Sequence, residues 1–271
     1  MSLLRSIILS FIILFPFSIF AKSQDILIKN ATVVTSTEIG VLDETDVLIQ
    51  NGKISLIGQN INNDEAMIIE AKGRVLTPGL ISPVTNLGLI EIELEAETRD
   101  DRTDHFSAGF SISSAFNPSS TLIPYNRASG ITSGIVFPSS GRGDIFSGLG
   151  SAFKTHGEID TKSIATDIAM VMQMGGNRDS RASNFLELED AFIKAKEFKK
   201  SRGMIQRGGF FDTGEYSERD LEALLGLIEE GKPLIVKTHR ASDMLRMIEF
   251  SEMHELDIMF HGAKEAWRIT D

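Results

Sequence analysis

The segment Val75-Leu76-Thr77-Pro78-Gly79-Leu80-Ile81 marks a change in the character of this 271-residue chain. The sequence before it is a series of short β-type runs, and the sequence after it alternates apolar strands with amphipathic helices. The next seven residues are Ser82-Pro83-Val84-Thr85-Asn86-Leu87-Gly88. Val84 and Asn86 are two residues apart, so on a strand their side chains point to the same face. The segment predicts the start of an α/β domain.

The part before this segment, residues 24–74, predicts a small β-sandwich. Runs rich in branched apolar residues occupy 26–28, 32–34, 46–50, 53–57 and 67–69. Asn51-Gly52 separates two of these runs and is a strong hairpin signal, because both residues tolerate a positive φ.

The part from residue 75 to 271 carries clear helix and strand signals near its end. Ser217 and Asp220 have capping-box spacing, and Gly231 is a stop signal for that helix. Strands are predicted at 234–238 and 257–261, joined by a helix for which Asp243 can serve as the cap. Such a strand–helix–strand unit is parallel.

Residues 91–200 are predicted to contain strands, a helix and long connections. Strands are expected at 130–137 and 168–172, and an amphipathic helix at 185–200. The stretch 138–150 is interpreted as a loop whose glycines provide flexibility or close backbone packing. Residues 91–130 form a long connection with little helical periodicity, and long loops of this kind are usually functional.

The Val-Leu-Thr-Pro-Gly-Leu-Ile segment closely resembles the entry into the first barrel strand of the amidohydrolase superfamily, in its imidazolonepropionase-like branch. In that family the strand continues as Asp-x-His-x-His, whose two imidazoles bind zinc. Here the three positions hold Ser82, Val84 and Asn86. The resemblance covers roughly residues 25–271 and implies an α/β fold: a metal-dependent-hydrolase-type TIM barrel with a small N-terminal β-sandwich part. About six barrel strands are expected, and the chain is interpreted as C-terminally incomplete.

The resemblance also implies metal ligands. The segment 233–240 is similar to the family's fifth-strand segment, with Lys237 at the usual ligand place and His239 two residues later. His261 matches the sixth-strand histidine. These three residues are the candidate ligands for zinc or another divalent metal; the alternative is that the two histidines are structural and hydrogen-bonded to loops. A protonated Lys237 would repel a dication unless it is deprotonated or carbamylated.

Charged residues near the expected barrel mouth provide further candidates. Glutamates alternate with apolar residues from Glu91 to Glu97, which would place four carboxylates on one face of an extended segment, either at the mouth or in solvent. The following segment 99–102 is expected to form ion pairs within itself on the surface. Asn86, Glu91 and Arg240 are the candidate substrate-binding residues, and no catalytic residue is assigned.

The implied activity is hydrolysis of a C–N bond in an amide, cyclic amide or dipeptide by a metal-activated water. The alternative is a non-catalytic small-molecule-binding or partner subunit that has lost the metal site. Residues 1–23 resemble a signal peptide, with Arg5 before an apolar run and small residues at cleavage spacing, which predicts a periplasmic or secreted protein. Membrane contact is expected only through that segment.

The composition limits the partners of this chain. It has no cysteine, which excludes disulfides and cysteine-based zinc sites. The net charge is −11, and signal cleavage would make it more negative by removing Arg5 and Lys22. Such a surface repels phosphate backbones, so no nucleic acid is expected as a partner. A small-molecule substrate is expected, together with a homo-oligomer or a pairing with a paralogue.

Overall fold

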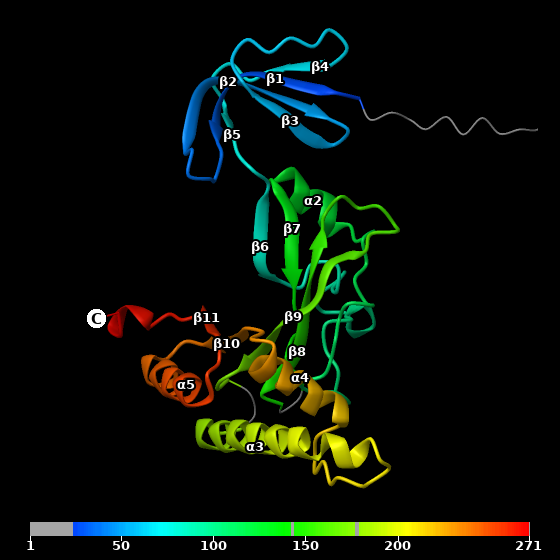
Figure 1. Ribbon diagram of the computed structural model, residues 1–271, viewed down its shortest axis with the longest axis vertical. Coiled ribbons are helices and arrows are strands. Elements are labelled where there is room, and N and C mark those ends of the chain that lie inside the picture. The colour runs from blue at the N-terminus through cyan, green and yellow to red at the C-terminus, as the bar shows by residue number, and fades with distance from the viewer. Residues whose placement is uncertain (1–23, 142–143, 177–178, 271) are drawn as a thin grey trace, which may run out of the picture. The chain divides into compact units, whose positions relative to one another are not determined.

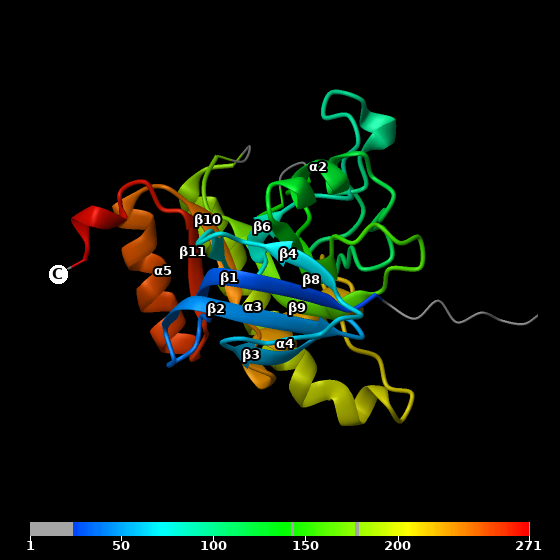
Figure 2. The same ribbon diagram turned by 90° about the horizontal axis from the view of Figure 1, so that it is seen from above.

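A computed structural model describes residues 24–141, 144–176 and 179–270 of the chain (Figures 1 and 2). The predicted signal peptide lies outside the described residues. The chain divides into two compact units, with the boundary between Pro78 and Gly79. Among the described residues, no helix combines the length and apolar character needed to span a bilayer.

The first unit is one five-stranded sheet. Its strands are β1 (Ile26–Val34), β2 (Val41–Gln50), β3 (Lys53–Gly58), β4 (Met67–Glu70) and β5 (Val75–Leu76). The order is β3-β2-β1-β4, and β5 also pairs with β1. A small apolar core of Ala31, Val33, Val47 and Ala71 covers one region of the sheet. The predicted sandwich is therefore present as one sheet in the described residues.

The hairpin predicted at Asn51-Gly52 is confirmed. It joins the antiparallel strands β2 and β3, with φ of 51° at Asn51 and 73° at Gly52. The two runs expected at 26–28 and 32–34 form one strand, β1, which is interrupted by Asn30 with a φ of 53°. Asn tolerates this left-handed conformation better than most side chains.

The second unit is a curled half-barrel sheet flanked by helices. Its strands are β6 (Leu80–Thr85), β7 (Ile131–Val136), β8 (Phe146–Lys154), β9 (Ser163–Gln173), β10 (Leu234–Thr238) and β11 (Ile258–Gly262). The strands lie in the order of the sequence, and Figure 1 shows them as a continuous series. Six strands agree with the number expected for this stretch.

One strand departs from the all-parallel barrel. β8 pairs antiparallel with both β7 and β9, whereas the β6–β7, β9–β10 and β10–β11 pairs are parallel. The interpretation of 138–150 as a loop was therefore wrong from Phe146 onward. The glycines of β8 allow close backbone packing, because a Cβ at Gly148 would lie 2.3 Å from the carbonyl oxygen of Phe110. A glycine-rich stretch can form a buried strand where other chain segments approach it this closely.

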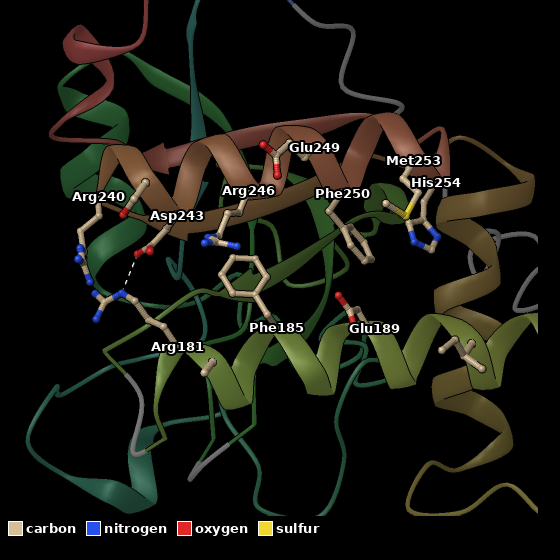
Figure 3. Close-up of a pocket in the computed structure, with 13 residues that line it drawn as sticks. Arg181, Phe185, Glu189, Arg240, Asp243, Arg246, Glu249, Phe250, Met253 and His254 are labelled. Atoms are coloured by element: carbon tan, nitrogen blue, oxygen red, sulfur yellow. Dashed lines mark hydrogen bonds and ion pairs between the residues drawn. The ribbon is translucent and has the colours of Figure 1, made fainter.

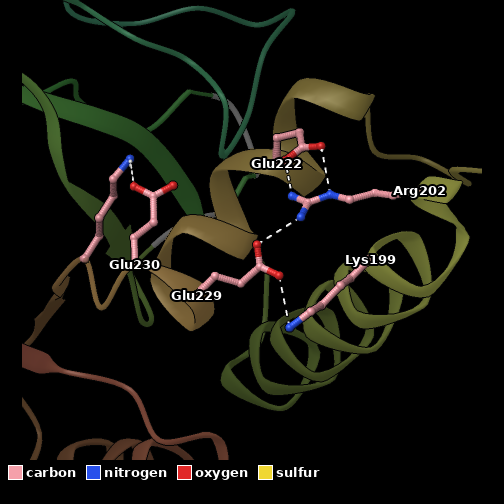
Figure 4. A network of polar contacts seen from close by, with 6 residues as sticks. Lys199, Arg202, Glu222, Glu229 and Glu230 are labelled. Atoms are coloured by element: carbon pink, nitrogen blue, oxygen red, sulfur yellow. Dashed lines mark hydrogen bonds and ion pairs between the residues drawn. The ribbon is translucent and has the colours of Figure 1, made fainter. Parts of the chain in front are cut away.

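The helices are α2 (Leu122–Ala128), α3 (Arg181–Ile205), α4 (Glu218–Glu229) and α5 (Ala241–His254). Two 3₁₀ turns, η1 (Ala96–Thr98) and η2 (Ala266–Arg268), complete the elements. α3, α4 and α5 pack on the outer face of the sheet around buried residues such as Met170, Leu224 and Met247. Arg202 on α3 pairs with Glu222 and Glu229 on α4, and Lys199 reaches Glu229 at 3.0 Å (Figure 4).

The helix starts were predicted with mixed success. The capping box at Ser217 and Asp220 is confirmed, since each side chain binds the backbone N–H of the other residue. Asp243 is not the cap of α5; the N-cap is Arg240, and Asp243 lies in the first turn, where Arg181 donates a 2.7 Å bond to it. The first amide of α5 instead donates to Glu265 at 3.0 Å. This capping contact is non-local, so the local sequence did not reveal it.

Candidate functional site

The carboxyl ends of β9, β10 and β11 bring three polar side chains into one row. Lys237 is paired in register with Gln173 on one side and with His261 on the other. Lys237 has the same strand parity as Ile235, which belongs to the apolar cluster on the inner face of the sheet. The row therefore lies on the inner wall at the mouth of the half-barrel, the end where α/β barrels hold their active sites.

His239 follows β10 and packs against the end of β11. A Cβ at Gly262 would lie 2.4 Å from Cε1 of His239, so only glycine leaves room for this imidazole. Gly262 has a φ of 90°, which also favours glycine. The carbonyl oxygen of His239 accepts a 3.0 Å bond from the amide of Glu265. The structure thus places Lys237, His239 and His261 close together.

Asp101 approaches this row from the connection after β6. It is fully buried, and Arg99 donates to both carboxylate oxygens at 3.1 and 2.9 Å. The ion pair expected within 99–102 is confirmed, but its position on the surface was wrong. Burial opposes ionisation of Asp101, yet hydrogen bonds from Arg99 and Ser139 outweigh it and hold its pKa below the usual value. Asp101 therefore carries a negative charge.

Burial lowers the pKa of both basic groups in the row. Burial lowers the pKa of Lys237, and the charge of Asp101 partly opposes this effect. Burial also lowers the pKa of His261, and the charges of Lys237 and His239 lower it further. A neutral imidazole can accept a proton, and a lysine with a lowered pKa is more readily deprotonated.

Hydroxyl and amide groups continue the polar surface of the mouth. The hydroxyls of Ser140 and Ser147 lie 2.7 Å apart, and Ser140 also donates to Oε1 of Gln173 at 3.3 Å. Beside them is a cavity of about 370 Å³, lined by Ala96, Arg99, Arg102, Thr103, Asp104, Ser140 and Gly141. The sequence did not single out Gln173, although its place at the end of a predicted strand was a usable signal.

The donor set in the described residues does not fit a catalytic metal. Val84 packs in the inner apolar cluster with Phe137, Val171 and Ile235. Within residues 24–141, 144–176 and 179–270, no three His, Cys, Asp or Glu side chains converge closely enough to hold a metal ion. A hydrolytic zinc centre requires about three protein ligands with one open position. We therefore assign no metal-dependent step to the described residues.

The candidate substrate-binding residues lie in three different places. Asn86 is exposed in the turn after β6, where its carbonyl oxygen accepts from Leu89. Glu91 is held by its own connection, because Asn117 and Ser120 donate to its carboxylate at 2.8 and 3.0 Å. Arg240 lines a groove between α3 and α5. The structure does not bring these three side chains into contact with one another.

The alternating glutamate segment is not a strand. Residues 92–97 are all exposed and form turns and η1, with the hydroxyl of Thr98 donating to the carbonyl oxygens of Ile92 and Glu95. Period-two alternation was therefore misleading here. Local hydrogen bonds from a threonine compete with strand pairing and favour a compact turn.

No protein-family model matches the chain. It is 39% identical over 104 residues to a D-hydantoinase from Geobacillus stearothermophilus, which covers 36% of this chain and 19% of that protein. It is 46% identical over 55 residues to a dihydroorotase from Halalkalibacterium halodurans, covering 20% of this chain and 12% of that protein. The chain thus matches less than a fifth of the length of these relatives.

A solved structure matches nearly the whole chain. The amidohydrolase from Thermotoga maritima MSB8 aligns with a TM-score of 0.76 and 26% sequence identity. The alignment covers 90% of this chain and 66% of that protein. A 5-methylthioadenosine/S-adenosylhomocysteine deaminase from Thermococcus sibiricus is 37% identical over 67 residues, which covers 25% of this chain and 16% of that protein. Together these similarities support the amidohydrolase superfamily as the family of this chain.

Proposed function

We propose that this chain is an exported hydrolase of carbon–nitrogen bonds, of the imidazolonepropionase-like branch, which acts on an amide, cyclic amide or dipeptide. The observation that carries the proposal is the row of Gln173, Lys237 and His261 at the carboxyl ends of adjacent parallel strands, with Asp101 facing it. The names of the relatives, a hydantoinase, a dihydroorotase and a deaminase, support the same class of reaction.

The roles of the residues follow from their chemistry. A protonated Lys237 would hold the oxygen of a substrate carbonyl and stabilise the negative charge that develops on it. His261 would take a proton from the attacking water and return it to the leaving nitrogen as the C–N bond breaks. Asp101 would favour the charged form of Lys237, and Gln173 would orient the substrate amide through hydrogen bonds. No step of this proposal passes through a metal ion.

A second candidate function is a non-catalytic small-molecule-binding subunit that pairs with a paralogue. The position of Val84 favours it, because this residue packs among apolar side chains where the family resemblance expects a metal-binding imidazole. The expected ligand in both cases is a small molecule, with no nucleic acid. We also propose a periplasmic or secreted location. The test is to express the full chain in a bacterial host and to determine by mass spectrometry whether the exported protein has lost residues 1–23.

Hydrolysis and metal content together test the two functions. Purified full-length chain is assayed against a hydantoin, dihydroorotate and a dipeptide, with and without added zinc, and its metal content is determined. The hydrolase proposal expects turnover that Lys237→Met and His261→Ala reduce by about two orders of magnitude or more. His156→Ala is the matched control, since the imidazole of this exposed histidine bonds to the 158–161 turn, away from the row. Ligand binding without turnover in any assay would instead support the binding subunit.

A further inference from the structure

An open groove of about 900 Å³ runs between α3 and α5 on the outside of the second unit (Figure 3). Phe185 of α3 and Phe250 of α5 point into it from the two helices, at successive positions along its length, and provide apolar surface. Ile193 and Met253 lie farther along and are 55% and 76% exposed. The groove therefore presents apolar surface to solvent between two rigid helices, as protein-binding grooves do.

Arginine side chains gather at one end of this groove. Arg181 is held by Asp243 at 2.7 Å, whereas Arg240 and Arg246 form no ion pair with any residue that the structure describes. Figure 3 shows the guanidinium of Arg246 reaching down from α5 toward Phe185. Glu249 lies one turn beyond it on α5. This end of the groove is positively charged on a chain whose net charge is −11.

At the opposite end of the groove, positive and negative charges offset one another. Nζ of Lys196 lies 2.9 Å from Nδ1 of His254. The positive charge of Lys196 lowers the pKa of His254, and the negative charge of Glu189 raises it. These charges offset one another locally. An acidic partner is therefore attracted to the arginine end rather than along the whole groove.

The same chain carries a segment that complements this groove. Residues 92–97, here called the acidic knob, are all exposed and include Glu93, Glu95 and Glu97. Leu94 is 95% exposed and Ile92 is 56% exposed. The knob thus combines three carboxylates with one almost fully exposed apolar side chain, Leu94, and one half-exposed apolar side chain, Ile92.

The acidic knob is held in one shape before any partner arrives. Thr98 donates to two of its carbonyl oxygens at 2.9 Å, and Arg99 donates to the carbonyl oxygen of Glu93 at 3.0 Å. A bridge between Ile90 and Arg99 closes its base. Preorganisation of this kind lowers the entropic cost of binding.

We propose that the chain self-associates by inserting the acidic knob of one copy into the α3/α5 groove of a second copy. Leu94 would pack against Phe185 and Phe250, and the glutamates would pair with Arg240 and Arg246. The contact joins different surfaces of the two copies, so it forms rings or chains rather than being limited to a symmetric dimer. The proposal does not rest on the hydrolytic function.

A charge-reversal mixing experiment tests the contact by sedimentation velocity on the full chain. One variant carries Glu93→Lys and Glu95→Lys in the knob, and the other carries Arg240→Glu and Arg246→Glu in the groove. Each variant alone pairs like charges, so its self-association should weaken at least about tenfold relative to wild type. In the mixture, each knob meets a groove of opposite charge, so association should return.

Matched controls separate this contact from a general effect of charge. Glu252→Lys changes the charge of α5 at an exposed residue outside the groove lining and should leave association unchanged. Leu94→Asp should weaken association without disturbing the circular dichroism spectrum. If a reversal variant misfolds, this variant provides the test of the contact instead. A wild-type chain that stays monomeric at high micromolar concentration overturns the proposal, as does a mixture that associates no better than its components. An unrelated protein bound in the groove, with no self-association, overturns it as well.

Discussion

Lys237 on β10 lies directly opposite His261 on β11 in the parallel pairing of these strands. The amine and the imidazole therefore share the mouth of the half-barrel, and the charge of Lys237 affects the protonation of His261. Burial is the largest cause of the lowered pKa of His261, and the positive charge of Lys237 adds to it. A change in the charge at Lys237 should therefore be measurable at His261.

Replacing Lys237 by methionine should raise the pKa of His261. The substitution removes a positive charge that disfavours the imidazolium, whereas burial still keeps the pKa below its ordinary value. An NMR titration of the Cε1 proton of His261 measures this directly. Lys264→Met is the control, because Lys264 is an exposed cation near the same strand end that does not contribute to the shift of His261. An unchanged or lowered pKa in Lys237→Met would show that the two groups do not interact.

The elements that the sequence predicted well are those with local signals. The hairpin at Asn51-Gly52 depends on two adjacent residues, and the start of α4 depends on Ser217 and Asp220, three residues apart. The strand β8 was missed because its stability comes from distant partners. Gly150 packs against Phe137, and Gly148 against Phe110, and such contacts leave no periodic pattern in the local sequence.

The site was predicted in part for the same reason. Strand parity and the parallel unit were enough to bring Lys237 and His261 together. The surface position predicted for Asp101 is wrong. The connection after β6 folds back and brings this carboxylate near Lys237, and the sequence does not show this fold. A buried charge is held by a hydrogen-bonded partner, here Arg99, and only the tertiary fold shows that the pair is buried.

Replacing Gly150 by alanine should destabilise the second unit. A Cβ at this position would lie 2.1 Å from two ring carbons of Phe137, so the ring or the strand must move. Overpacking of this kind costs about 1–3 kcal/mol of the free energy of unfolding, which urea denaturation measures. Gly203→Ala in α3 is the control; its nearest neighbouring atom is 3.7 Å away, and the change should stabilise the helix by about 0.5–1 kcal/mol. Equal effects of the two substitutions would contradict the packing of β8.

Replacing Asp220 by alanine should remove three hydrogen bonds, two from backbone amides and one from the Ser217 hydroxyl at 2.6 Å. One carboxylate oxygen accepts from the amide of Gly109 at 2.7 Å and the other from the amide of Ser217 at 2.9 Å. Because Asp220 is only 5% exposed, water cannot replace these bonds, and a loss of about 3 kcal/mol in the free energy of unfolding is expected. Faster hydrogen exchange at the Gly109 amide gives a local readout. Glu218→Ala, an exposed change in the same turn, should cost less than about 0.5 kcal/mol.

Glu187 on α3 should make the second unit less stable as the pH rises. Burial raises its pKa from 4.5 to about 7, with a smaller contribution from the negative charges of Asp144, Asp179 and Glu215, while a backbone hydrogen bond from Ile145 opposes the shift. The folded chain therefore binds more protons than the unfolded chain between pH 4.5 and about 7. Linkage then requires the free energy of unfolding to decrease across this interval and to level off above it.

Glu187→Gln tests this dependence, because glutamine keeps the shape of the protonated side chain and cannot ionise. Urea denaturation of the variant should show a shallower decrease between pH 4.5 and about 7, and a higher free energy of unfolding than wild type above that interval. Some slope should persist, since burial and Asp220 also raise the pKa of Asp144. Glu218→Gln, at an exposed position on α4, should leave the wild-type slope unchanged. If Glu187→Gln retained the full slope, other carboxylates would be its source, and Glu187 would be ionised in the fold at little cost.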